Sequence, residues 1–76
     1  MNIEKQMNIV KFFAEKGNLV ITKHSYNDNW FFGTHYKNGM GEADSFEKAL
    51  YKLIDNVMLY LKEHEQKELI RLLEKN

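Results

Sequence analysis

The chain has no cysteine among its 76 residues, and Arg71 is its only arginine. Without cysteine, neither a disulfide framework nor a thiolate zinc site can support the fold. The scarcity of arginine disfavours a protein that reads phosphates or bases, because the planar guanidinium suits those contacts best. An ordinary apolar core must therefore hold the protein together, and nucleic acid is not the expected partner.

Neither sign of charge is in excess, since 11 basic residues balance 11 acidic ones. A balanced charge creates no overall field that would attract nucleic acid or an anionic membrane. No apolar run approaches the roughly 20 residues that a membrane helix needs, and no signal peptide opens the chain. We therefore expect a cytoplasmic protein with no membrane partner.

The chain does contain enough apolar and aromatic material for one small core. Hydrophobic residues make up 43% of the sequence and aromatic residues 13%. A chain of 76 residues allows one domain, in which large aromatic side chains supply much of the buried area. Residues 1–76 are therefore predicted to form a single small α/β domain.

The beginning of the chain has the apolar spacing of an amphipathic helix, which we expect over residues 2–16. Lys16 suits the last turn of such a helix, and Gly17 suits the position after it. The expected apolar stripe carries Ile3, Met7, Val10 and Ala14, and it is widened by Ile9, Phe12 and Phe13. A stripe of this kind is the side of a helix that packs inward.

Three strands are expected next, over residues 19–25, 30–37 and 40–43. The first contains the β-branched run Val20-Ile21-Thr22, and residues 26–29 have the composition of a turn. Between the second and third strands, Asn38-Gly39 predicts a type I′ hairpin turn, because both residues tolerate a positive φ. The pattern therefore predicts a three-stranded antiparallel meander.

A second helix is predicted after the strands, beginning at Asp44 or Ser45. Asp44 and Glu47 have the spacing of a capping box. The helix is expected to bury a stripe made of Phe46, Leu50, Leu53, Val57 and Leu61, with Ala49, Ile54 and Met58 beside it. The sequence therefore predicts a long second helix.

The end of the chain allows two interpretations. Residues 62–68 are polar, leucines then return, and neither glycine nor proline forces a break. One helix over 45–75 would be about 46 Å long. A domain of this size has a radius of gyration of only about 12 Å, so such a helix would project from it. We therefore expect a bend near His64 and a short third helix, which completes an α+β fold in the order α-β-β-β-α-α. The alternative is a projecting tail that forms a homodimer through Leu61, Leu69, Leu72 and Leu73.

The two turns predict which side chains share a face of the sheet. We expect Ser25 to lie opposite Trp30, and His35 to lie opposite Glu42. One face, apolar enough to be the core face, then carries Leu19, Ile21, Trp30, Phe32, Thr34, Tyr36 and Ala43. The other carries Val20, Thr22, His24, Phe31, Gly33, His35 and Glu42. Val20 and Phe31 on this second face need cover, either from the protein's own helix, which is the more common arrangement, or from a partner.

No pattern in the sequence predicts catalysis or a metal or cofactor site. His35 beside Glu42 could exchange a proton, but an ordinary cross-strand charge pair explains the two residues equally well. His64-Glu65-Gln66-Lys67-Glu68 lacks the second histidine of the zinc-protease HExxH motif. Gly39-Met40-Gly41 lies inside a hairpin and not between a strand and a helix, where a phosphate loop would be. We therefore expect a protein that is not an enzyme and has no cofactor.

Two resemblances to known families follow from this layout. The order of elements is similar to that of the double-stranded RNA-binding domain, but Asp44 and Glu47 stand where that domain has a basic cluster. Roughly residues 6–58 resemble the phage "ABA sandwich" type of small protein. The resemblance lies in Lys16-Gly17, Leu19-Val20-Ile21, Trp30-Phe31-Phe32, Glu42-Ala43-Asp44-Ser45 and Ala49-Leu50. It implies a phage or prophage origin and brings no catalytic residues.

The expected function is therefore that of a non-enzymatic interaction or inhibitor protein that occludes another protein. The residues expected to bind the partner are Val20, His24, Phe31, His35 and Glu42. The alternative is a nucleic-acid-binding accessory module that uses the aromatic strand over residues 30–36 with Lys23 and Lys37.

Overall fold

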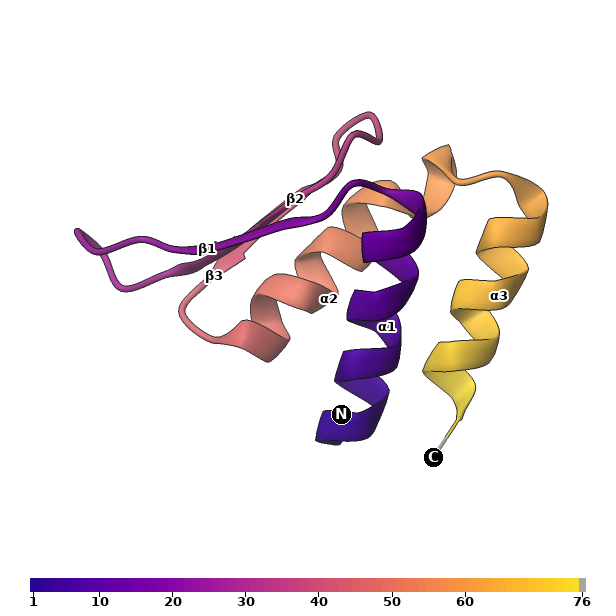
Figure 1. The fold of residues 1–76 in the computed structure, drawn as a ribbon, viewed down its shortest axis with the longest axis horizontal. Coiled ribbons are helices and arrows are strands. Elements are labelled where there is room, and N and C mark those ends of the chain that lie inside the picture. Colours follow the sequence, from indigo (N-terminus) through magenta and orange to yellow (C-terminus); the bar gives the residue numbers. More distant parts are fainter. Residues whose placement is uncertain (76) are drawn as a thin grey trace.

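The computed structural model describes residues 1–75. Its order of elements confirms the predicted α+β fold, including the separate helix at the end of the chain. The sheet lies above the helices in Figure 1, with α2 beneath it and with α1 and α3 side by side. The elements are α1 (Ile3–Lys16), β1 (Val20–Lys23), β2 (Trp30–Gly33), β3 (Met40–Ala43), α2 (Phe46–Val57), the single 3₁₀ turn η1 (Met58–Tyr60) and α3 (Glu63–Glu74).

Helix α1 begins and ends where its capping residues allow. The Asn2 side chain accepts a hydrogen bond from the Lys5 N–H at 2.7 Å, and the Gly17 N–H donates to the Phe13 carbonyl at 2.7 Å. The predicted apolar stripe is only half right. Ile9, Phe12 and Phe13 are buried, whereas Ile3, Met7 and Ala14 are exposed and Val10 is half-buried. The large aromatic residues, which remove the most apolar area from water, decide which side packs inward.

The sheet has the strand order β1-β2-β3 and is antiparallel throughout, as predicted. Both registers differ from the prediction. Lys23 and not Ser25 lies opposite Trp30, a shift of two residues, and Phe31 and not His35 lies opposite Glu42, a shift of four. Because side chains alternate with a period of two, these even shifts leave the predicted faces of the strands unchanged.

The second strand ends at Gly33, four residues before its predicted end at Lys37, because the chain leaves the sheet there. The His35 N–H donates to the Gly17 carbonyl at 2.9 Å, and Tyr36 turns toward the helices. The turn that follows is closed by the Gly39 N–H, which donates to the Tyr36 carbonyl at 2.9 Å. Asn38 has a φ of 56°, but Gly39 does not have a positive φ, so the predicted type I′ turn is wrong.

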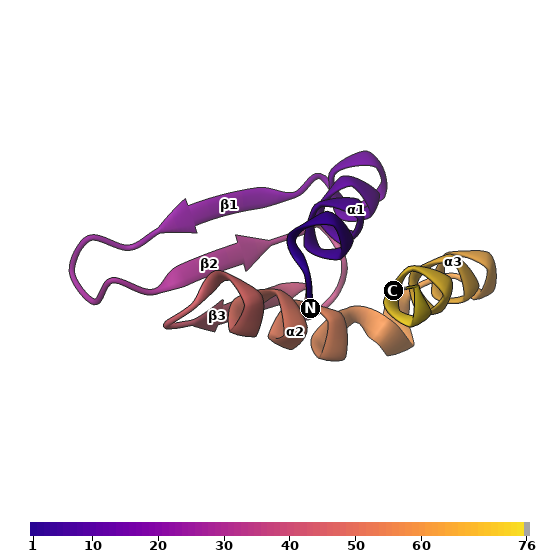
Figure 2. The ribbon, with the colours of Figure 1, turned by 90° about the horizontal axis from the view of Figure 1, so that it is seen from below.

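Helix α2 packs against the inner face of the sheet, the face that carries Phe32 and Ala43 (Figure 2). Its cap is Ser45, whose hydroxyl accepts a hydrogen bond from the Lys48 N–H at 3.1 Å, so the predicted box between Asp44 and Glu47 does not form. The strand β3 approaches α2 closely because Gly41 has no side chain: a Cβ there would lie 2.5 Å from the Leu53 nitrogen.

The chain bends at Leu61 and Lys62, where the backbone becomes extended, slightly before the predicted bend near His64. The Glu65 side chain accepts a hydrogen bond from the Lys62 N–H at 2.9 Å, which caps α3. The Gln66 side chain donates to the Met58 carbonyl at 2.7 Å, which satisfies a group freed at the end of α2. Helix α3 then runs back along α1 and brings Leu69 into the core.

Candidate functional site

The face of the sheet opposite α2, named the outer face here, carries exposed apolar side chains. In the part of the chain that the structure describes, no helix packs on it (Figures 1 and 2). Val20 and Met40 are 56% and 55% exposed there, at the two edges of the sheet. Gly33 lies between them, and the Phe31 ring leans over it, since a Cβ at Gly33 would lie 3.0 Å from that ring. Three apolar side chains therefore span the outer face.

Three rings of the outer face form a stack that continues toward the turn between β1 and β2. The His24 ring lies 5.7 Å from Phe31 and 5.2 Å from Tyr26, with interplanar angles of 16° and 18°. The Tyr26 hydroxyl also lies 3.2 Å from His24 Nδ1. Each ring therefore limits the movement of the next, and the outer face presents a preformed aromatic surface.

Glu42 lies beside this ring stack and is held by two asparagines. Its Oε2 accepts hydrogen bonds from Asn29 Nδ2 at 3.0 Å and from Asn27 Nδ2 at 3.4 Å, and it lies 3.7 Å from His24 Nδ1. The hydrogen bond from Asn29 lowers the pKa of Glu42, and although partial burial opposes this, the nearby His24 also favours the carboxylate. The outer face therefore carries a fixed negative charge at neutral pH.

The local sequence explains why the asparagines reach this carboxylate. The Asn27 side chain accepts a hydrogen bond from the Asn29 N–H at 3.0 Å, which is the geometry of an Asx turn. Asp28 adopts a φ of 60°, a conformation that aspartate and asparagine tolerate better than most residues. The turn predicted for residues 26–29 is thus confirmed, and it also positions the polar part of the site.

Four of the five residues predicted to bind a partner share the outer face: Val20, His24, Phe31 and Glu42. His35 does not belong to it. Its ring stacks on Tyr36 at 4.7 Å in the loop after β2, and the predicted pair of His35 with Glu42 is wrong because the register differs by four residues. His24 takes the place near Glu42 that was expected for His35.

The leucines predicted to form a dimer through the tail are used inside the chain. Leu61 and Leu69 are buried, and Leu72 and Leu73 are half-buried against the same core. The projecting tail is therefore wrong, because the bend at Leu61 lets α3 fold back onto α1. A dimer through this set of leucines would require α3 to detach.

Sequence reasoning missed Met40 and Tyr26, and it also missed the two asparagines that hold Glu42, Asn27 and Asn29. Met40 shares the outer face with Glu42 by simple alternation along β3, so this signal was present in the sequence. Tyr26 belongs to the turn, and its position over His24 depends on how that turn folds. No sequence pattern indicates such a contact.

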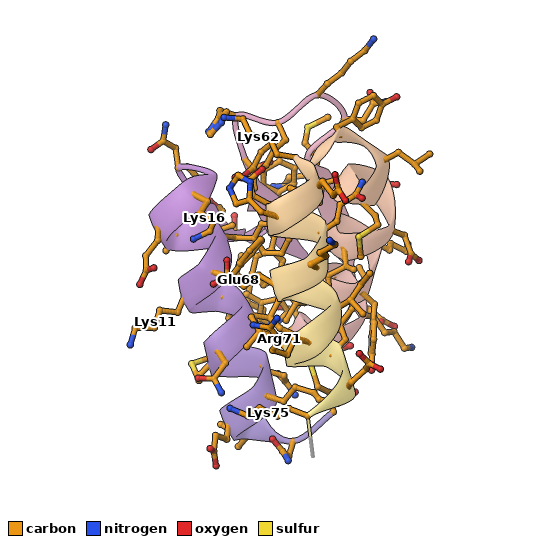
Figure 3. The ribbon with its side chains drawn as sticks, turned by 90° about the vertical axis from the view of Figure 1, so that its right-hand side faces the viewer. Lys11, Lys16, Lys62, Glu68, Arg71 and Lys75 are labelled. Carbon is orange, nitrogen blue, oxygen red and sulfur yellow. The ribbon has the colours of Figure 1, made fainter. Side chains whose placement is uncertain are left out.

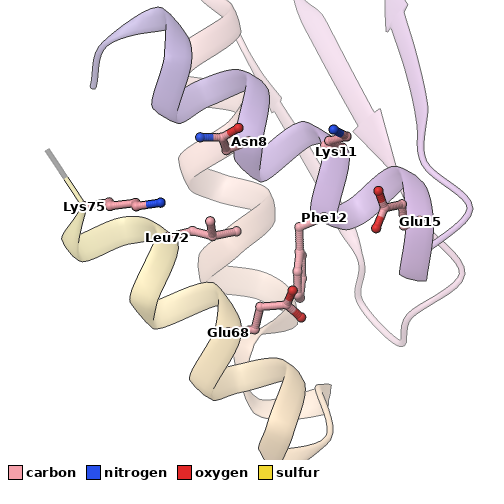
Figure 4. Close-up of a pocket in the computed structure, with 7 residues that line it drawn as sticks. All are labelled: Asn8, Lys11, Phe12, Glu15, Glu68, Leu72 and Lys75. Atoms are coloured by element: carbon pink, nitrogen blue, oxygen red, sulfur yellow. The ribbon is translucent and has the colours of Figure 1, made fainter.

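Away from the outer face, a hollow lies between α1 and α3 and has a volume of about 240 Å³ (Figure 4). Lys11, Lys16, Lys62, Arg71 and Lys75 lie on this side of the molecule (Figure 3). Glu68 pairs with Lys16 at 3.3 Å, and Glu15 also lines the hollow. Because acidic groups stand among the basic ones, this hollow does not offer an anion a uniformly positive site.

The remaining chemistry is limited. Within residues 1–75, no three His, Asp or Glu side chains gather as a metal site would require. None of the helices over the same residues is both long enough and apolar enough to span a membrane. Comparison of the chain with family models, curated proteins and solved structures finds no match.

Proposed function

We propose that this protein is a non-enzymatic interaction protein that binds another protein through the outer face and inhibits it by occlusion. The observation that carries the proposal is the row of Val20, Phe31 and Met40 on the face of the sheet that no helix covers. Exposed apolar side chains that adjoin one another mark contact surfaces more often than scattered ones do. A phage or mobile-element origin and action in the cytoplasm belong to the same proposal.

The ring stack supports a contact role because its rings are already in place before binding. Ordering a free side chain at an interface costs about 0.5–1.5 kcal/mol, and a stacked ring avoids much of that cost. Aromatic residues also dominate the energetic centres of protein interfaces. Phe31, which is half-buried under His24, is the residue best suited to such a centre.

Glu42 offers a binding position for a polar group of the partner, next to the apolar row. Asn27 and Asn29 fix the carboxylate without neutralising its charge. A basic or amide side chain of the partner would find a positioned acceptor there, so Glu42 would set orientation while Phe31 provides apolar contact.

The alternative function, nucleic-acid binding through the aromatic strand, has less support. Trp30 and Phe32 face inward, and Phe32 is completely buried. Lys23 lies over the Trp30 ring at 5.3 Å, and Lys37 lies over the Tyr60 ring at 5.7 Å. The bases of a bound strand would therefore contact the ring stack of the outer face, beside the negative charge of Glu42. Neither the Lys23 nor the Lys37 side chain lies next to that stack to bind the phosphates.

The test is capture of partners from a bacterial lysate on the tagged protein, with and without nuclease. Wild type is compared with Val20→Glu, Phe31→Glu and Met40→Glu. Ile70→Glu is the matched control, because Ile70 is a 46% exposed apolar residue on α3. We expect wild type and the control to capture a partner protein whose capture resists nuclease. The three outer-face variants should capture at least tenfold less of it.

Folding of every variant is checked by circular dichroism and thermal unfolding. Val20→Glu and Met40→Glu should fold normally, because both replace exposed residues. Capture that is equal for all variants would show that the outer face is not the binding surface. Capture that disappears with nuclease would favour the nucleic-acid module instead.

A further inference from the structure

The two edges of the sheet differ in how their backbone groups are used. At the β3 edge, α2 packs closely and the Asn56 side chain donates a hydrogen bond to the Met40 carbonyl at 2.5 Å. The β1 edge lies on the far side of the sheet, and no other element of residues 1–75 runs along it (Figure 2). All four residues of β1 are exposed. The β1 edge is therefore the open edge of the sheet.

The hydrogen-bond pattern identifies which groups of β1 point outward. The His24 N–H donates to the Asn29 carbonyl at 2.8 Å, so His24 and Asn29 face each other as a hydrogen-bonded pair. Antiparallel pairs alternate between bonded and non-bonded. The N–H and C=O groups of Ile21 and Lys23 therefore point away from β2, and none of these groups has a hydrogen-bond partner within residues 1–75.

The side chains of β1 also leave apolar area uncovered on both faces of the edge. Val20 is 56% exposed on the outer face, and Ile21 is 39% exposed on the inner face. An added strand would cover part of both side chains while pairing the free backbone groups. An exposed apolar edge with unpaired backbone groups is a template for another extended strand.

We propose that a second copy of this chain pairs with β1 in antiparallel fashion about a twofold axis at Ile21, which joins the two sheets into one of six strands. This axis places Ile21 opposite Ile21 of the second copy, with an exchange of two hydrogen bonds. It also places Lys23 opposite Leu19 of the second copy. The outward groups of one β1 strand thus meet those of the other.

The charge of Lys23 favours the register with the axis at Ile21 over the one with the axis at Lys23. An axis at Lys23 would place two lysines directly opposite each other, which destabilises a sheet. With the axis at Ile21, each Lys23 remains beside its own Asp28, at 3.3 Å, and the two lysines lie at opposite ends of the new pairing. The dimer covers part of Val20 but leaves Phe31 and Met40 uncovered, so Phe31→Glu and Met40→Glu test the outer face separately from the dimer.

The first test measures the mass of the protein in solution by light scattering at about 100 µM. Lys23→Pro removes the outward N–H but no bond to β2, because proline is tolerated on an edge strand in this position. Lys23→Ala, the matched control, removes the same side chain and keeps the N–H. We expect wild type and Lys23→Ala to have twice the mass of one chain and Lys23→Pro to have the mass of one chain. A monomeric wild type, or a dimeric Lys23→Pro, overturns the proposal.

A second test examines the register and does not depend on how the proline variant folds. The natural chain has no cysteine, so only an introduced thiol can form a disulfide. In Ile21→Cys the two Cα atoms would be about 5.5 Å apart, within disulfide range. In Val20→Cys the new thiol would lie opposite Thr22 of the second copy and out of reach of its equivalent. We expect at least tenfold faster oxidative cross-linking of Ile21→Cys, and equal rates for the two variants overturn the register.

Discussion

At the scale of single residues, the most consequential contact lies between Tyr36 and Glu65. The Tyr36 hydroxyl lies 3.1 Å from Glu65 Oε2 and 3.3 Å from the Lys16 carbonyl. This contact joins the end of α1, the loop after β2 and the start of α3. Burial, the hydrogen bond to Glu65 and the negative charge of that carboxylate raise the pKa of Tyr36 to about 12, so the hydroxyl keeps its proton as a donor at neutral pH.

The first residue-scale prediction concerns stability in acid. The hydrogen bond from the Lys62 N–H lowers the pKa of Glu65, and although burial opposes this, the bond from Tyr36 adds to the lowering. A carboxylate with a lowered pKa stabilises the fold above its ordinary pKa of about 4.3, and this stabilisation is lost as pH falls through the lowered value. Glu65→Gln should therefore lose about 1–2 kcal/mol of unfolding free energy at pH 7. It should also show a weaker loss of stability between about pH 5 and pH 3.

The measurement is urea unfolding of both proteins over that pH range. Glu63→Gln is the control, since Glu63 lies in the same first turn of α3 but is exposed and, within residues 1–75, pairs only with Lys67. Exposed pairs of this kind contribute roughly 0–1 kcal/mol. An equal loss in the two variants would mean that the Tyr36 contact adds nothing beyond the helix terminus.

At the scale of elements, the contact between β3 and α2 positions the whole sheet. It depends on Gly41, where a side chain would meet the backbone of α2 at Ala49 and Leu53. Because backbone atoms cannot swing aside, any residue larger than glycine must push the strand away from the helix. Tertiary packing therefore sets the requirement at this position, and no sequence motif around Gly41 signals it.

We accordingly predict that Gly41→Ala destabilises the protein by about 2–4 kcal/mol, through overpacking between β3 and α2. Gly33→Ala is the control, because the added Cβ would meet only the ring of Phe31, a side chain that can move. It should cost less than about 1 kcal/mol. Thermal unfolding of the two variants checks the difference, and a Gly41→Ala protein as stable as Gly33→Ala would contradict the close approach.

The sheet shows how a wrong register can still identify the right surface. The sequence predicted Ser25 opposite Trp30 and His35 opposite Glu42, and both pairings were wrong. Because the shifts were even, Val20, His24, Phe31 and Glu42 stayed together on the outer face. Only His35 was misplaced, since the chain leaves the sheet after Gly33 to insert Tyr36 between the helices. The turn at Asn38 and Gly39 could not reveal this, because the contacts of His35 and Tyr36 with the end of α1 and the start of α3 join distant parts of the chain.

At the scale of the whole molecule, α3 closes the core. The radius of gyration is 11.8 Å, in agreement with a domain of this length folded back on itself. Leu69 is completely buried, beside a core to which every other helix contributes. A chain of 76 residues has little core to spare, so the loss of one helix affects the stability of all elements.

We therefore predict that truncation after Lys62 abolishes the cooperative fold. The truncated chain would lose Glu65 and Leu69 and would leave Phe12 without the cover of α3. Near-ultraviolet circular dichroism of the single Trp30, together with thermal unfolding, should show loss of fixed packing. Removal of residues 75–76 alone is the control and should leave the transition within about 2 °C, since Lys75 is exposed and chain ends contribute little to stability. A truncated chain that unfolds cooperatively would contradict the role of α3.

Local signals in the sequence were enough to predict the order of the elements and the faces of the strands, because apolar spacing and alternation act over a few neighbouring positions. Apolar spacing was also enough to place Phe32, Leu50 and Leu53 in the core. The tertiary structure alone decided the strand registers, the inward side of α1 and the open edge at β1. These depend on contacts between distant segments, above all on Tyr36 meeting Glu65 and on Gly41 meeting Leu53, and no local pattern encodes such contacts.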